Sequence, residues 1–167
     1  MKKFSKIMAV MVCTLVVVVS SLLLGACGGA SAYNVAGVTL SGNGELQCII
    51  VWNENATPEI KEQTLSDMGY QTEQELIDFY VSRLDDVILL ITLEFQNDGT
   101  LLYTDGKFED HVYYYEQSED FKIVELYSNA GHTSDVDGMR VEFINGEEYL
   151  RVLKMSAFSA YFRLYKV

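Results

Sequence analysis

The sequence predicts a mainly β fold with a small α insert. We expect an antiparallel up-and-down meander that closes into a small, roughly eight-stranded barrel, complete or incomplete. Short runs of alternating apolar and polar residues recur through the second half of the chain. Turn signals such as Asn97-Asp98-Gly99 and Asn145-Gly146 separate these runs. An open meander of this length would leave two bare edges, and closure into a barrel removes them.

The strand candidates are short and follow one another through short connections. The first is the β-branched and aromatic run at 46–52, and the second begins at residue 87 and reaches Phe95. The remaining candidates are 100–104, 112–116, 121–127, 139–143, the segment around 150–152, and 158–165. Eight strands is the number at which side chains just fill a barrel or leave space for one small ligand.

Two helices are expected between the first two strand candidates, in an insert at about 57–86. Thr57 is placed to cap the first helix, with Pro58 in the first helical position, and Gly69 to end it. Thr72 with a glutamate three residues later has capping-box spacing and begins the second helix. The predicted helices are roughly 58–68 and 73–85. One apolar stripe should pack the insert onto the barrel: Leu76, Tyr80 and Leu84.

The first residues have the layout of an export signal. Lys2, Lys3 and Lys6 precede an uncharged, apolar stretch at 7–24. The length of this stretch touches the lower bound of ~18 residues for a membrane-spanning helix, so an uncleaved anchor is the alternative. Leu23-Leu24-Gly25-Ala26-Cys27 resembles the lipobox of bacterial lipoproteins. The resemblance implies removal of a signal peptide at 1–26 and a diacylglyceryl group on Cys27, and two acyl chains anchor a protein stably.

The expected organisation is a signal peptide at 1–26, a flexible tether at 27–44 and a barrel domain at 45–167. Residues 28–44 are small, glycine-rich and nearly uncharged. We expect the mature protein on the outer face of the bacterial cell membrane, in the cell envelope. It would retain one cysteine besides Cys27, Cys48, which lies among apolar residues and is expected in the core.

The net negative charge of the expected mature chain argues against nucleic acid and anionic lipid as partners. The mature chain has nine basic and 24 acidic residues, a net charge of −15. Such a surface repels phosphate backbones and anionic lipid. We therefore expect no nucleic-acid partner, and contact with the membrane only through the N-terminal lipid.

A second resemblance concerns the barrel. The run from Ile91 to Thr100, with its strand-Asn-Asp-Gly-Thr pattern, is followed by repeated hairpins and the closing Tyr161-Phe162-Arg163-Leu164. This part of the chain resembles the lipocalin-like domains of small bacterial lipoproteins. The resemblance covers roughly the second half of the chain and implies a barrel that can enclose a small ligand.

No arrangement of residues in the sequence predicts an enzyme, a cofactor or a metal centre. His111 and His132 lack metal-ligand spacing and are expected at solvent-facing positions. Neither a nucleophile elbow nor a phosphate-binding glycine loop is present. Asp135 and Asp137 before Gly138 could offer oxygens to Ca²⁺, but Ile144 stands where a calcium loop has its glutamate. An ordinary solvated turn is the favoured interpretation of this segment.

Two classes of function remain. The first is a non-enzymatic module that binds a small apolar or amphipathic ligand. The alternative is a structural or protein-interaction lipoprotein of the cell surface with a filled barrel. Tyr113, Tyr114 and Tyr115 cannot form one ligand platform, because successive strand residues point to opposite faces. The expected inward side chains are large, which favours filling: Leu89, Ile91, Leu93, Phe95, Met139, Phe143, Phe158 and Phe162.

Overall fold

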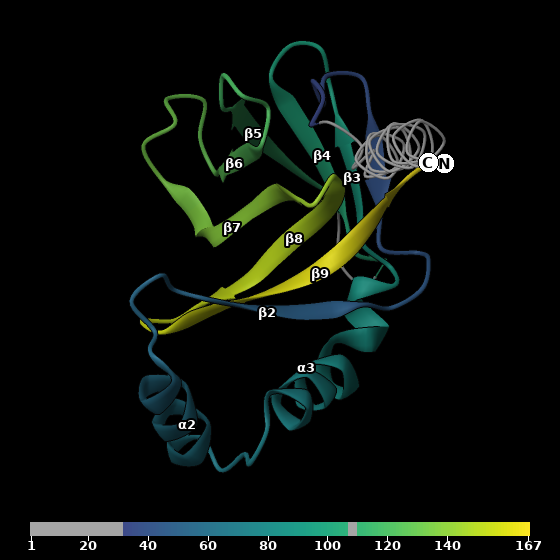
Figure 1. Ribbon diagram of the computed structural model, residues 1–167. Helices are drawn as coiled ribbons and strands as arrows, with labels where there is room; N and C mark the ends of the chain where they lie inside the picture. Colours follow the sequence, from purple (N-terminus) through teal and green to yellow (C-terminus); the bar gives the residue numbers. More distant parts are fainter. Residues whose placement is uncertain (1–31, 107–109) are drawn as a thin grey trace, which may run out of the picture. The chain divides into compact units, whose positions relative to one another are not determined.

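The computed structural model describes residues 32–106 and 110–167, which form nine strands and two helices (Figure 1). In chain order these elements are β1 (Thr39–Ser41), β2 (Cys48–Trp52), α2 (Pro58–Asp67), α3 (Glu73–Ile88), β3 (Thr92–Phe95), β4 (Thr100–Thr104), β5 (His111–Gln117), β6 (Ile123–Tyr127), β7 (Asp135–Ile144), β8 (Glu147–Lys154) and β9 (Phe158–Lys166). The predicted class, mainly β with a small helical insert, is confirmed.

All strands belong to one antiparallel sheet that closes on itself. Its order is β1-β3-β4-β5-β6-β7-β8-β9-β2, and a further pairing of β1 with β9 closes eight strands into a barrel. β1 and β2 pair with successive parts of β9, since Ser41 pairs with Tyr165 and Cys48 pairs with Phe162. The predicted meander and its closure are therefore confirmed, and the barrel is compatible with a lipocalin-like fold.

The start of the domain differs from the prediction. β1 lies inside the expected tether, and the side chains of Val35 and Leu40 are fully buried. A strand of three residues between glycine-containing segments is too short to show alternation. Because β1 precedes β2, the helices lie between the second and third strands instead of the first and second. Gly42 is needed after β1, since a Cβ atom there would lie 1.8 Å from the carbonyl oxygen of Ile88.

The end of α3 is a second difference. Alternation favoured a strand from residue 87, but α3 continues to Ile88 and Leu89 is its C-cap residue. Ile88 is 2% exposed and packs in the core, so burial of this side chain outweighs its preference for a strand. Leu89 is consequently 37% exposed and does not point into the barrel.

The predicted caps and turns form as expected. The Thr57 hydroxyl oxygen accepts a hydrogen bond from the Ile60 amide at 3.4 Å, and that of Thr72 accepts one from Glu75 at 3.2 Å. Asn145 and Gly146 have φ angles of 53° and 83°, as a two-residue hairpin turn requires.

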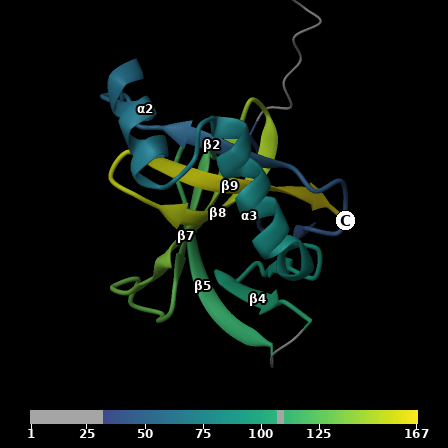
Figure 2. The same ribbon diagram turned by 90° about the horizontal axis from the view of Figure 1, so that it is seen from below.

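Inward side chains make one large apolar core and one smaller cluster. The large core draws residues from the barrel strands and from the end of α3. The smaller cluster joins the helices to the barrel and contains Ile50, Leu65, Leu76, Phe158 and Ala160. Leu76 is fully buried, and Tyr80 and Leu84 pack against the large core. Figures 1 and 2 both place the helices against β2 and β9, so the predicted docking of the insert is confirmed.

Candidate functional site

The barrel interior is the first candidate site. Most of the expected inward residues do point into the core. Five of them are at most 2% exposed: Ile91, Leu93, Phe95 and Phe162 lie in the large core, and Phe158 lies in the smaller cluster. Phe143 is 9% exposed, and Met139 is partly buried against the same core. Leu89 is the exception described above. The barrel is thus occupied by its own large side chains.

Three tyrosines line the β4–β5 side of the core and are less deeply buried. Tyr103 and Tyr113 are in edge contact, with ring centroids 5.9 Å apart, and Tyr115 meets Phe95 edge to face at 5.0 Å. Burial, with a contribution from the Asp105 charge, raises the pKa of Tyr103 to about 12. Tyr114 takes the opposite face of β5 by alternation, so the tyrosines do not form one platform.

Both histidines are exposed, as predicted. The His132 ring stacks on Tyr127 at 4.6 Å, and its Nδ1 lies 3.5 Å from the Glu116 carboxylate. His111 stacks on Tyr113 at 6.0 Å. Across residues 32–106 and 110–167, no three His, Cys, Asp or Glu side chains are grouped as a metal site.

The aspartate segment considered for calcium is part of a strand. Asp135 begins β7 and pairs with Tyr127, while Gly138, with a φ of 69°, lies within the same strand. The predicted turn is therefore wrong, since the segment lies within a strand whose register with β6 is irregular here, whereas Asp135 is exposed, as a solvated residue would be. The Asp137 side chain lies outside the described residues.

The expected mature chain has two cysteines, Cys27 and Cys48. Cys48 is buried in the core, and burial raises the pKa of its thiol to about 12. This thiol therefore stays protonated at neutral pH, and its predicted role as a small core residue is confirmed. Cys27, the predicted lipid attachment site, lies outside the described residues, as does the predicted signal peptide.

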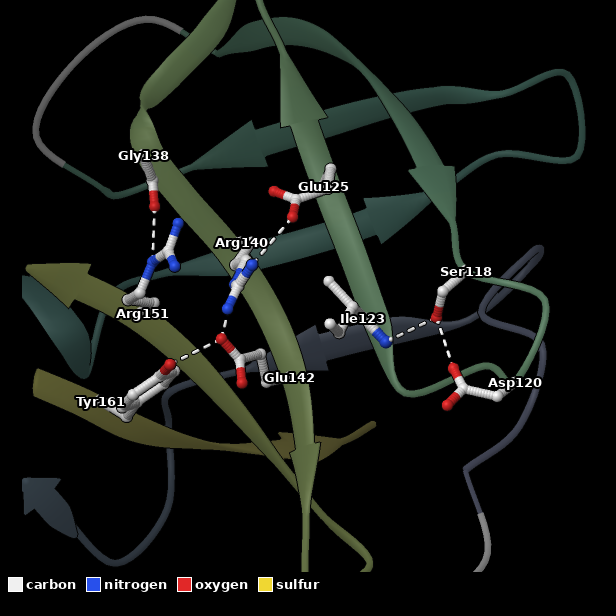
Figure 3. A network of polar contacts seen from close by, with 9 residues as sticks. All are labelled: Ser118, Asp120, Ile123, Glu125, Gly138, Arg140, Glu142, Arg151 and Tyr161. Atoms are coloured by element: carbon white, nitrogen blue, oxygen red, sulfur yellow. Dashed lines mark hydrogen bonds and ion pairs between the residues drawn. The ribbon is translucent and has the colours of Figure 1, made fainter. Parts of the chain in front are cut away.

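A network of charged and polar side chains covers the outer face of β6 to β9 (Figure 3). Arg140 on β7 donates to Glu125 on β6 at 3.0 Å and to Glu142 at 2.5 Å. The Tyr161 hydroxyl donates to Glu142 at 2.6 Å, and Arg151 donates to the Gly138 carbonyl at 2.8 Å. Acidic and basic groups neutralise one another across strands, so this face stabilises the sheet.

An open groove of about 320 Å³ lies between α2 and the β8–β9 turn. Its lining is uncharged on a strongly acidic chain and combines amide, hydroxyl and apolar side chains: Asn53, Asn55, Ala56, Ile60, Thr64, Ser156 and Ala157. The amide of Asn53 donates to the Ala157 carbonyl at 2.9 Å, and its side chain donates to Ser156. These bonds fix two walls of the groove that are far apart in the sequence. No local pattern could have indicated the groove for that reason.

No protein-family model, curated protein or solved structure matches the chain. Within the part that the structure describes, neither helix has the length and apolar character needed to cross a membrane.

Proposed function

We propose that this chain is an exported lipoprotein, anchored by a lipid on Cys27 to the outer face of the bacterial cell membrane. Its barrel would act as a filled scaffold that binds a protein of the cell envelope in the groove beside α2. One observation carries the proposal: large side chains occupy the interior, while an uncharged groove opens on the outside. The role is non-enzymatic.

The lining of the groove suits a protein segment. Asn55, Thr64 and Ser156 supply amide and hydroxyl groups that can bond to peptide groups, and Ile60, 44% exposed, offers an apolar contact. Interfaces commonly place such apolar contacts in the centre of a polar rim. The absence of charge in this lining also spares a partner the cost of removing water from a carboxylate.

The anchor is tested by replacing the lipid-bearing cysteine. Cys27→Ala should lose membrane retention or accumulate as an uncut precursor, as judged by fractionation and intact mass. Cys48→Ala is the matched control and should remain membrane-bound. A Cys27→Ala protein that fractionates and migrates like the wild type would contradict the anchor.

The groove is tested with a photo-crosslinking residue placed at position 60 in living cells. Val112, 60% exposed on β5, is the matched control for an exposed apolar position. We expect a crosslinked protein from position 60 and none from position 112. The groove assignment fails if position 60 yields no product or if both positions yield the same one.

A small-ligand carrier is the second candidate. It is favoured by the partly buried tyrosines on the β4–β5 side of the core, where the interior is less completely covered. Native mass spectrometry of protein from its own cell envelope separates the candidates. A retained small molecule that is lost in Leu93→Trp would support the carrier, whereas a ligand-free spectrum supports the filled scaffold.

A further inference from the structure

The chain just before β1 crosses one end of the barrel and is held there. We call residues 32–37 the strap. The Gln117 side chain at the end of β5 clamps it, because its amide nitrogen donates to the Tyr33 carbonyl at 2.8 Å. Its amide oxygen accepts from the Val35 amide at 3.0 Å. One side chain thus bonds the strap backbone in both directions, as a neighbouring strand would.

Side chains hold the strap at further points. The Tyr33 ring meets Phe143 edge to face at 5.1 Å, and its hydroxyl donates to Glu148 at 2.7 Å. The Lys166 ammonium lies 4.7 Å from the same ring. The Gly37 amide donates to the Phe95 carbonyl at 2.8 Å. The strap therefore contacts β3, β5, β7, β8 and β9, and Ala32, its first residue, packs against the core.

The strap defines two opposite ends of the barrel. The strap end carries the turns after β3, β5 and β7 and the end of β9. The helix end carries α2, α3 and the turn after β8, and with them the groove. β9 spans nine residues, or about 30 Å of strand, and the usual strand tilt of about 35–45° leaves roughly 21–25 Å between the two ends along the barrel axis.

We infer that the strap end faces the membrane and the helix end, with its groove, faces away from it. This inference rests on the proposed lipid on Cys27. Five peptide spans join Cys27 to Ala32, and they reach at most about 18 Å when fully extended. This reach is shorter than the barrel is long, so the helix end cannot be turned onto the membrane that holds the lipid.

The charge of the strap-end turn does not draw this end to the membrane. The strap-end turn at 118–122 has two exposed acidic residues, Glu119 and Asp120, and one exposed Lys122. Such a turn gains nothing from an anionic lipid surface. The short covalent connection sets the orientation, and the lipid surface is a neighbour of the strap end instead of a ligand bound by it.

The test compares two exposed glutamates replaced by cysteine. Glu119→Cys places a fluorophore at the strap end, and Glu62→Cys places one on α2 at the helix end. Buried Cys48 does not compete for the label. The lipidated full-length proteins are reconstituted into phosphatidylcholine vesicles that contain a lipid with a nitroxide quencher on its headgroup. We expect loss of most fluorescence at position 119 and little loss at position 62.

Equal quenching at both positions, as for a barrel lying on its side, or stronger quenching at position 62 would overturn the orientation. A flexible Gly/Ser insertion between Ser31 and Ala32 should reduce the difference between the two positions, because it lengthens the connection. Flotation with vesicles tests the anchor separately. If Cys27→Ala floats like the wild type, the proposed anchor fails, whereas floating, lipidated proteins with equal quenching reject the orientation alone.

Discussion

The strap end and the helix end of this barrel are closed in different ways. At the helix end, the apolar stripe of α3 covers the barrel, and Leu76 is fully buried among β2, α2 and β9 residues. At the strap end, the chain's own backbone is held by directional hydrogen bonds from Gln117. Closure by an amphipathic helix leaves a periodic pattern in the sequence, whereas the strap, held by Gln117 and by contacts of Tyr33 and Val35 with distant residues, leaves none.

The largest expected effect is a loss of stability at the helix end. Leu76→Ala should lower the free energy of unfolding by about 2–5 kcal/mol, because it leaves a cavity in the smaller cluster. Ile60→Ala, at a position 44% exposed on α2, is the matched control and should cost far less. Denaturant unfolding measures both. A Leu76→Ala cost no greater than that of Ile60→Ala would mean that the helices are peripheral.

A smaller effect is expected at the strap end. Gln117→Ala should lower the free energy of unfolding by about 1–3 kcal/mol, since the buried Val35 amide loses its acceptor. Gln71→Ala, which removes an exposed amide side chain before α3, should leave stability nearly unchanged. Denaturant unfolding of both variants measures this difference in stability. Equal unfolding midpoints for the two variants would show that the Gln117 side chain does not stabilise the strap.

The smallest expected effect is a change in how stability depends on pH, and it also concerns the strap end. Hydrogen bonds from the Ser118 side chain and the Lys122 amide lower the pKa of Asp120. A lowered folded-state pKa contributes stability above the unfolded-state value near 4 and loses it as pH falls through the folded-state value. Asp120→Asn should therefore flatten the acid side of the stability curve. Glu119→Gln in the same turn is the control, and equal curves for both variants would contradict the assignment.

The features that could be predicted from sequence are those with a local or periodic signal. Alternation identified the barrel strands after residue 91, the Asn145-Gly146 turn formed, and Thr57 and Thr72 cap the helices. Residues whose neighbours are distant in the chain gave no such signal. β1 is stabilised by β3 and β9 on its two sides, and α3 extends to Ile88 because that side chain fills the core.

The candidate sites also differ in whether a local sequence pattern predicts them. The large inward side chains predicted a filled barrel, and the structure places most of them in the large core. The groove was missed because Asn53 and Ser156 meet only through the pairing of β2 with β9. The Gln117 clamp was missed because a polar residue at a strand end resembles any solvated one.

Hydrogen exchange at the Val35 amide tests most directly whether the chain from Ala32 belongs to the barrel. In the wild type this amide should exchange slowly, like that of Gly37, which bonds to the Phe95 carbonyl. In Gln117→Ala, exchange at Val35 should become much faster while the buried amides of β3 keep their protection. Fast exchange at Val35 in the wild type would contradict the account, because the strap would then be part of a free tether.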